Sequence, residues 1–323
     1  MSEWRPSAAI DNIRHRAKSY AQIRAFFAAR GVLEVDTPIM SHAAVTDPHL
    51  ASVSAYFQTL GSSQTQTCYL QTSPEYAMKR LLAAGLPSMY QLCKVFRNGE
   101  VGRYHNPEFT LLEWYRLDFD EHKLMDEVDA LIQVLLGTLP AERIAYEDIF
   151  LQLLHVNPHE ATVATLKEIA HAQGIEGDVL YQETDKDLWL ELLMSHVIEK
   201  RIGRVCPLFI YDFPASQAAL AKINPERPEI ASRFELYYQG IELANGFYEL
   251  SHAEEQARRF AGDLQKRQRL GLPAVPQDYR LLAALQAGLP ECAGVALGVD
   301  RVLMIATGAT HLDEVIAFPF AVA

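Results

Sequence analysis

The sequence has few cysteines, no long apolar run and a deficit of positive charge. Its four cysteines, Cys68, Cys93, Cys206 and Cys292, are widely separated and form no C-x-x-C pair. This spacing argues against a disulfide framework or a cysteine-bound zinc ion. The N-terminus lacks an apolar signal segment, and no stretch approaches the length of a transmembrane helix. We therefore expect a cytoplasmic protein without a membrane association.

Acidic side chains outnumber basic ones by 41 to 29, which gives a formal net charge of −12. Such a surface repels a phosphate backbone unless a local basic patch overrides it, and no basic stretch is visible. The composition therefore points away from RNA as a partner. A chain of 323 residues with 49% hydrophobic residues is otherwise typical of an ordinary globular protein.

The most informative stretch runs from Phe96 to Tyr115 and reads FRNGEVGRYHNPEFTLLEWY. Pro107 cannot donate to a sheet ladder, so the return strand is expected to begin near Phe109. Two antiparallel strands joined by a loop that bears arginine and histidine would suit a polyanion held across a sheet. The alternative is a β-hairpin whose polar loop is merely solvated.

Two helices and a strand are predicted before this hairpin. Residues 9–30 have apolar side chains at helical spacing, and residues 31–38 form a short strand that Pro38 stops. Residues 76–82 form a second helix, with Ser73 as its cap and Pro74 at its first position. Glu75 is then either a functional carboxylate or a first-turn acid favoured by the helix dipole.

Residues 233–249 read as a second hairpin, which turns at Gln239-Gly240. Glu242 and Glu249 are seven residues apart, so they would face opposite sides of an ideal strand. A bulge around Asn245-Gly246 would bring them together, and Mg²⁺ between them would suit two carboxylates beside an anionic ligand. The alternative is an exposed, charged strand.

A strand of small residues, Gly294 to Gly298, leads into an apolar helix, with Asp300-Arg301 at the junction. Together with the stretches above, it resembles the three motifs of class II aminoacyl-tRNA synthetases, in the version found in lysyl-tRNA synthetases. Residues 9–38 match motif 1, residues 96–115 match motif 2, and Gly294 to Arg301 matches motif 3. The resemblance implies an α+β fold with an antiparallel sheet flanked by helices. It further implies one catalytic domain over residues 1–323, with a mostly helical insertion at about 141–205, and a homodimer.

The resemblance also implies the residues of the site. Those expected to bind ATP are Arg97, Asn98, Gly99, Glu100, His105, Asn106, Phe109, Glu242, Leu243, Gly298 and Arg301. Those expected to bind the amino acid are Ser73, Pro74, Glu75, Glu113, Tyr115, Asn245, Glu249 and Ala296. Arg97 and Arg301 are the expected catalytic residues, and Glu242 and Glu249 the expected Mg²⁺ ligands. In the family, Phe109 and Arg301 would hold the adenine between them.

Two positions depart from the family pattern. Gly99 stands where the family usually has a glutamate that reads the adenine edge, so either Glu100 or backbone groups would take that role. Ala296 stands where lysyl-tRNA synthetases have glycine. Its methyl group either alters the choice of amino acid or merely fills a gap.

Motif 1 begins close to the first residue, so we expect the anticodon-reading domain of lysyl-tRNA synthetases to be absent. The chain thus resembles the lysyl-tRNA synthetase paralogues that modify elongation factor P. That resemblance implies activation of (R)-β-lysine by ATP and its transfer to a lysine of elongation factor P, with no tRNA. The alternatives are a truncated synthetase-like enzyme with another acceptor and a non-catalytic amino-acid sensor. The intact Arg97, Glu242, Glu249 and Arg301 argue against the sensor.

Overall fold

The computed structural model describes residues 4–177 and 182–323. Residues 1–3, and residues 178–181 of the insertion expected at about 141–205, lie outside the described residues. The chain forms two compact units. Unit 1 comprises Met1–Asp118, Ser251–Cys292 and Ala296–Ala323, and unit 2 comprises Phe119–Leu250 and Ala293–Val295.

The hairpin predicted from residues 96–115 lies in unit 1. β5 (Met89–Phe96) pairs antiparallel with β6 (Glu108–Leu117) and parallel with the short β1 (Leu33–Glu34). β11 (Cys292–Gly298) lies next to β6 on its other side. Pro107 directly precedes β6, so the return strand begins within one residue of the predicted place.

Aromatic side chains attach the first helix to this sheet. α1 (Ile10–Ala28) places Phe27 against β5 and β6, where its ring stacks on Tyr90 at 4.4 Å and meets the edge of Trp114 at 5.3 Å. α9 (Val299–Thr307) contacts both α1 and β6. The buried aromatic cluster therefore fixes the helix of motif 1 on the strands of motif 2.

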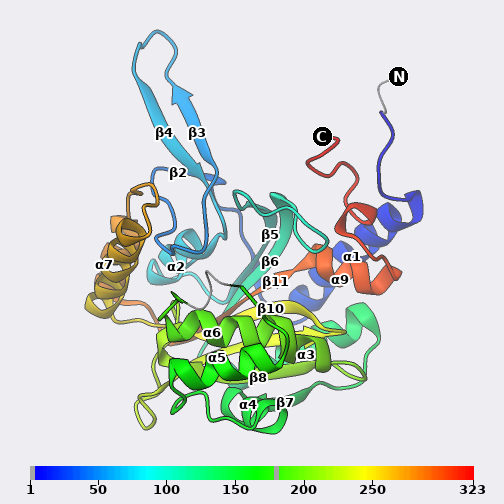
Figure 1. The fold of residues 1–323 in the computed structure, drawn as a ribbon. Helices are drawn as coiled ribbons and strands as arrows, with labels where there is room; N and C mark the ends of the chain where they lie inside the picture. Colours follow the sequence, from blue (N-terminus) through cyan, green and yellow to red (C-terminus); the bar gives the residue numbers. More distant parts are fainter. Residues whose placement is uncertain (1–3, 178–181) are drawn as a thin grey trace. The chain divides into compact units, whose positions relative to one another are not determined.

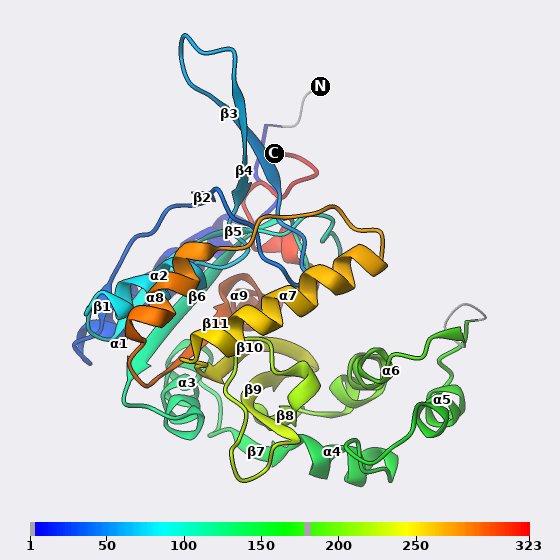
Figure 2. The ribbon, with the colours of Figure 1, turned by 90° about the vertical axis from the view of Figure 1, so that its left-hand side faces the viewer.

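A long hairpin projects from unit 1. Figure 1 shows it as β3 (Ser54–Gln58) and β4 (Thr65–Leu70), with β2 (Met40–Ser41) paired to β4 near its base. Three further helices belong to the same unit. Figure 2 shows α2 (Glu75–Ala83) beside α8 (Tyr279–Gly288), and α7 (Ala253–Arg269) contacts α8.

In unit 2, β10 (Ile241–Tyr248), β9 (Ile230–Tyr238), β8 (Leu208–Pro214) and β7 (Glu142–Ala145) follow one another in space. Neighbours are antiparallel except for β7 and β8. The helices of this unit are α3 (Glu121–Leu136), α4 (Tyr146–Leu154), α5 (Val163–Ala172) and α6 (Lys186–Leu193). A π-helical turn (Met194–Ile198) continues α6, and short 3₁₀ turns lie at Glu199–Arg201 and Ala215–Gln217, with another, Leu312–Glu314, in unit 1.

A buried hydrophobic cluster of unit 2 lies between α4, α5, α6 and β8. α3 contacts β9 and β10, and α4 contacts β7 and β8. α5 and α6 lie side by side in Figure 1. Buried aromatic side chains join these elements, among them Phe150 of α4, Trp189 of α6 and Phe213 of β8. The α+β class with largely antiparallel strands flanked by helices is confirmed.

The β9–β10 hairpin turns at Gln239-Gly240 as predicted, and both residues have positive φ, 54° and 74°. The predicted position of the bulge was wrong. The register shifts between Glu242 and Ala244, so the extra residue is Leu243, and the pairing from Ala244 onward is regular. Gly246 has another role, because a Cβ there would lie 2.3 Å from the ring of Phe234.

No helix among the described residues is long and apolar enough to cross a membrane.

Candidate active site

The loop between β5 and β6 is anchored by its backbone. The Arg97 N–H donates to the Pro107 carbonyl at 2.9 Å, and the Asn98 N–H donates to the Ala51 carbonyl at 2.8 Å. Gly99 has φ of 83°, a conformation that side chains with a Cβ rarely adopt. This turn favours glycine at position 99, and it leads directly to Glu100.

Arg97 is arranged to bind an anion. Its guanidinium lies over the Phe109 ring at 5.0 Å, and its Nη1 lies 3.9 Å from a carboxylate oxygen of Glu100. Its Nε is buried and has no hydrogen-bond partner among the described residues. A buried donor without a partner is costly, so this atom fits a ligand oxygen such as that of a phosphate or carboxylate.

Arg301 of α9 meets the far end of the same loop. Its Nη2 donates to His105 Nε2 at 2.9 Å, and its Nε donates to the Tyr104 carbonyl at 3.3 Å. Five residues of unit 1 that were predicted to bind ATP thus gather around one loop, and we name them the nucleotide cluster. They are Arg97, Glu100, His105, Phe109 and Arg301.

Asn106 differs from these residues, because its side chain forms hydrogen bonds with backbone groups. Its Nδ2 donates to the Glu108 carbonyl at 2.6 Å, and its Oδ1 accepts from the Phe320 N–H at 3.0 Å. It therefore ties the loop to the C-terminal segment. A contact between Asn106 and ATP stays a prediction, as does a contact with the exposed Asn98.

A second group of predicted residues meets around a buried carboxylate. Glu113 is only 2% exposed, and its two oxygens accept from Ser73 Oγ at 2.6 Å and from Tyr115 Oη at 2.7 Å. Glu113 and Tyr115 share one face of β6 because they are two residues apart on a strand. Ser73 also accepts from the N–H of Glu75, and Pro74 occupies the cap position of α2.

Sequence reasoning missed Lys79 in this group. Its side chain is 1% exposed, and its Nζ donates to a carboxylate oxygen of Glu75 at 2.6 Å. The E-x-x-x-K spacing on a helix predicts such a pair, but not that the lysine is buried. We name Ser73, Glu75, Lys79, Glu113 and Tyr115 the amino-acid cluster.

The electrostatics of the amino-acid cluster favour a cationic ligand. Burial raises the pKa of Glu113 to about 7, with a further contribution from the Glu75 carboxylate, while Ser73, Tyr115 and Lys79 oppose the rise. Two carboxylates face one ammonium group, so the fully ionised cluster carries one negative charge. An ammonium group of a substrate would neutralise it.

Four predicted residues lie in unit 2, namely Glu242, Leu243, Asn245 and Glu249. Leu243, at the bulge, and Glu249 are each 2% exposed, and Asn245 Oδ1 accepts from Arg233 Nε at 3.2 Å. Burial raises the pKa of Glu235, Arg233 opposes the rise, and Glu242 adds to it. The buried ion pair of Arg233 with Glu235 was not foreseen, although their spacing of two residues places them on one face of β9.

The described residues contain no group of three or more histidine, cysteine or acidic side chains that could hold a metal ion. Mg²⁺ often takes only one or two carboxylates and completes its shell with substrate phosphates and water. Glu242 and Glu249 fit that donor set. Their role as Mg²⁺ ligands stays a prediction.

Ala296 and Gly298 alternate along β11 with the buried Val295 and Leu297, so they share the strand face that is only half-buried. Both predicted residues therefore lie on the more accessible face of the strand.

Known proteins match this chain over nearly its whole length. The family model described as tRNA synthetases class II (D, K and N) matches residues 2–322. The chain is 55% identical over 322 residues to elongation factor P–(R)-beta-lysine ligase of Vibrio vulnificus strain YJ016, a match that covers 100% of this chain and 99% of that protein. Proteins of the same name from Vibrio cholerae serotype O1 and Klebsiella pneumoniae subsp. pneumoniae are 56% identical over 319 residues and 53% identical over 315 residues. These two matches cover 99% and 98% of this chain, and 98% and 97% of the relatives.

Proposed function

The chain belongs to the class II tRNA synthetases of the D, K and N group, and from that premise we propose that it activates (R)-β-lysine with ATP and transfers it to a lysine of elongation factor P. It is then an ATP-dependent ligase that joins an amino acid to a protein. The relatives that carry this activity in their names match the chain over nearly its whole length.

The observation that carries the proposal is the buried carboxylate of Glu113, held by Ser73 and Tyr115 beside the Glu75–Lys79 pair. A desolvated carboxylate binds an ammonium group far more strongly than one in water. β-Lysine has two ammonium groups and one carboxylate. We propose that Glu113 and Tyr115 bind its side-chain ammonium and that Glu75 faces its β-ammonium.

In the first step, a carboxylate oxygen of the amino acid attacks the α-phosphorus of ATP, and pyrophosphate leaves. The product is an aminoacyl-adenylate. Arg97 would contact both reacting anions through its guanidinium, and its buried Nε, which has no partner among the described residues, would donate to one of them. His105 and Arg301 would contact the distal phosphates. Such a step depends on positioning and charge neutralisation more than on proton transfer.

Mg²⁺ supplies further charge neutralisation at the phosphates when it is bound. Glu242 would hold the Mg²⁺ ion. Glu249 would contact both the ion and the ammonium group of the amino acid. The assignments of Leu243 and Gly298 to ATP, and of Asn245 and Ala296 to the amino acid, rest on their places in the family motifs.

In the second step, the ε-amine of the acceptor lysine attacks the acyl carbon of the adenylate. A C–N bond forms, the bond between the acyl carbon and the phosphate oxygen breaks, and AMP leaves. The amine must arrive neutral, which is unfavourable near neutral pH because its free pKa is about 10.4. The acceptor ammonium gives up one proton to become neutral, and the attacking amine gives up a second as the amide forms; both pass to solvent.

We further propose that the protein works as a cytoplasmic homodimer and that tRNA is not its acceptor. The net charge of −12 supports the last point, since an acidic surface repels a phosphate backbone. The organisation of residues 1–323 as one catalytic domain stays a prediction.

Pyrophosphate exchange tests the first step. The amino acids to compare are (R)-β-lysine, α-lysine, aspartate and asparagine, which cover the known branches of the family. We expect exchange with (R)-β-lysine, weaker exchange with α-lysine, and none with aspartate, whose second carboxylate Glu113 and Glu75 would repel. Glu113→Gln keeps the shape of the side chain, so loss of exchange in that variant would assign the ammonium to Glu113. Exchange that depends on aspartate would contradict the proposed function.

A further inference from the structure

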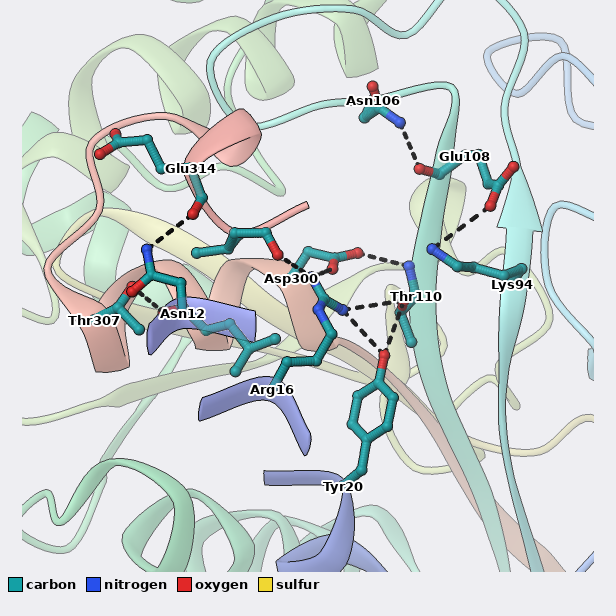
Figure 3. Close-up of polar contacts among 12 residues, drawn as sticks. Asn12, Arg16, Tyr20, Lys94, Asn106, Glu108, Thr110, Asp300, Thr307 and Glu314 are labelled. Carbon is teal, nitrogen blue, oxygen red and sulfur yellow. Dashed lines mark hydrogen bonds and ion pairs between the residues drawn. The ribbon is translucent and has the colours of Figure 1, made fainter. Parts of the chain in front are cut away.

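A buried ion pair joins three parts of unit 1 that are far apart in the sequence. Figure 3 shows Arg16 of α1 against Asp300 of α9, with Thr110 of β6 beside both. The side chains of Arg16 and Asp300 are 16% and 3% exposed. Besides its ion pair with Asp300, Arg16 donates to the Val315 carbonyl at 2.7 Å and to Tyr20 Oη at 3.0 Å. The guanidinium is therefore held from several sides.

The second oxygen of Asp300 reaches the strand of motif 2. Asp300 Oδ2 accepts from the backbone N–H of Thr110 at 2.6 Å. Thr110 directly follows Phe109, and Asp300 directly precedes Arg301. The residue next to Arg301 thus binds the backbone of the residue next to Phe109. Arg301 and Phe109 are the two side chains that are proposed to lie on either side of the adenine.

Stability alone does not account for this pair. Burial disfavours the charged guanidinium, but Asp300 and Tyr20 outweigh that effect and raise the pKa of Arg16. The position of Asp300 in the first turn of α9 also favours its negative charge. A well-packed apolar pair is nevertheless often as stable as a buried ion pair. An apolar pair forms no directional hydrogen bond. The Asp300 carboxylate accepts from the N–H of Thr110 and thereby fixes the start of α9 relative to β6.

From this geometry we infer that Arg16 and Asp300 are positioning residues for ATP, which set the spacing between Arg301 and Phe109. The inference rests on the proposed function, since it takes these two residues to hold the adenine. Arg16 acts through Asp300, which it holds in place. Removal of either side chain lets the start of α9 shift against β6 and weakens ATP binding.

Two conservative variants and a matched control test this inference. Arg16→Lys keeps the charge but loses the planar fork, so it cannot bond Asp300, Val315 and Tyr20 together. Asp300→Asn keeps the shape and can still accept from Thr110, but it loses the ion pair with Arg16. The control is Arg14→Lys on the same helix, where the pair with Asp11 is almost fully exposed.

ATP affinity is measured by calorimetry without an amino acid, alongside the KM values for both substrates. We expect Arg16→Lys and Asp300→Asn each to weaken ATP binding by about tenfold, which is the effect of losing one well-placed hydrogen bond to a charged group. The KM for the amino acid and the ATP affinity of the control should stay within about twofold. Wild-type ATP affinity in both folded variants would overturn the inference.

A double-mutant cycle separates positioning from a loss of general stability. In an Arg301→Ala background, Arg16→Lys should lose most of its effect on ATP affinity, because the side chain that it positions is gone. An equal loss in both backgrounds would contradict the inference and assign the pair to stability. ATP binding is measured without an amino acid, so the result does not depend on which amino acid is activated. Failure of the wild type to bind ATP would instead overturn the proposed function.

Discussion

The amino-acid cluster and the nucleotide cluster of unit 1 differ in how far their side chains are exposed to solvent. The amino-acid cluster is buried and held by bonds between side chains, with Glu113 and Lys79 at 2% and 1% exposed. The nucleotide cluster is more open, and the side chains of Arg97 and Glu100 are 29% and 28% exposed. Burial makes each charge contact stronger and more selective, which suits recognition of one small amino acid. A more open cluster of arginines suits a large polyanion that enters and leaves with each turnover.

The largest expected effect comes from the nucleotide cluster. Arg97→Ala should lower the rate of adenylate formation by about 100- to 1000-fold, or about 3–4 kcal/mol, because it removes a donor from the reacting phosphate. Pyrophosphate exchange measures the loss, and thermal unfolding checks that the fold is intact. Arg24→Ala is the matched control, since Arg24 lies on α1 in an exposed pair with Glu34. Near-wild-type exchange in a folded Arg97→Ala variant would contradict the assignment of Arg97.

Ala296→Gly tests whether a residue outside the amino-acid cluster contributes to the discrimination between α-lysine and (R)-β-lysine as substrates. Overpacking by one methyl group costs about 1–3 kcal/mol, and a methylene difference in a pocket gives roughly 10- to 200-fold discrimination. The variant should therefore improve α-lysine activation relative to (R)-β-lysine by about that factor. The measurement is the ratio of kcat/KM for the two lysines in variant and parent. An unchanged ratio would mean that Ala296 does not contribute, and the choice between the two substrates would then be assigned to Glu75 and Glu249.

The raised pKa of Glu113 predicts a pH dependence that is specific to the amino-acid cluster. Below about pH 7, Glu113 carries a proton in the free protein and cannot pair with an ammonium group. At saturating ATP, kcat/KM for the amino acid should fall by up to about tenfold per pH unit below pH 7 and level off above it. The residual activity of Glu113→Gln, measured at high amino-acid concentration, should lack this limb of the profile. The same limb in Glu113→Gln would assign it to another group.

Stability should change in the opposite direction. Between its ordinary pKa of 4.5 and about 7, Glu113 binds more protons in the native state than in the unfolded state. Its contribution to the free energy of unfolding therefore decreases as pH rises through that window. Lys79→Met removes the cation that lowers the pKa of Glu113, so the activity limb should move to higher pH. Arg80→Met, at an exposed neighbour on α2, should leave the profile in place.

The smallest effect is expected at the edge of the nucleotide cluster. If Glu100 takes the role of the family's adenine-reading glutamate, Glu100→Ala should raise the KM for ATP by roughly fivefold, a modest loss because the side chain is partly exposed. It should also weaken the preference for ATP over GTP. Unchanged values would mean that backbone groups read the base and that Glu100 only pairs with Arg97.

Local signals in the sequence predicted much of this architecture. The positions of Pro107 and of Gln239-Gly240 placed two hairpins correctly, because proline and residues with positive φ constrain the backbone wherever they occur. The bulge was misplaced because a glycine in a strand has two explanations. Gly246 makes room for the Phe234 ring on the neighbouring strand, and sequence spacing does not reveal that contact.

The residues that sequence reasoning missed depend on contacts at long range. Lys79 looks like a solvated helix lysine until α2 packs and buries it beside Glu75. Arg16 and Asp300 lie 284 residues apart, and neither belongs to a local pattern that names the other. Motif spacing thus predicts which side chains face the ligand, whereas the packing of helices on the sheet determines which side chains hold them there.

The most direct test of the central claim is the fate of the activated amino acid. Purified protein is incubated with ATP, labelled (R)-β-lysine and either elongation factor P or bulk tRNA, with α-lysine in a parallel reaction. The account predicts label from (R)-β-lysine in an amide that survives base treatment, on a single lysine of elongation factor P, with none on tRNA. Label that accumulates on tRNA as a base-labile ester, with elongation factor P unmodified, would contradict it.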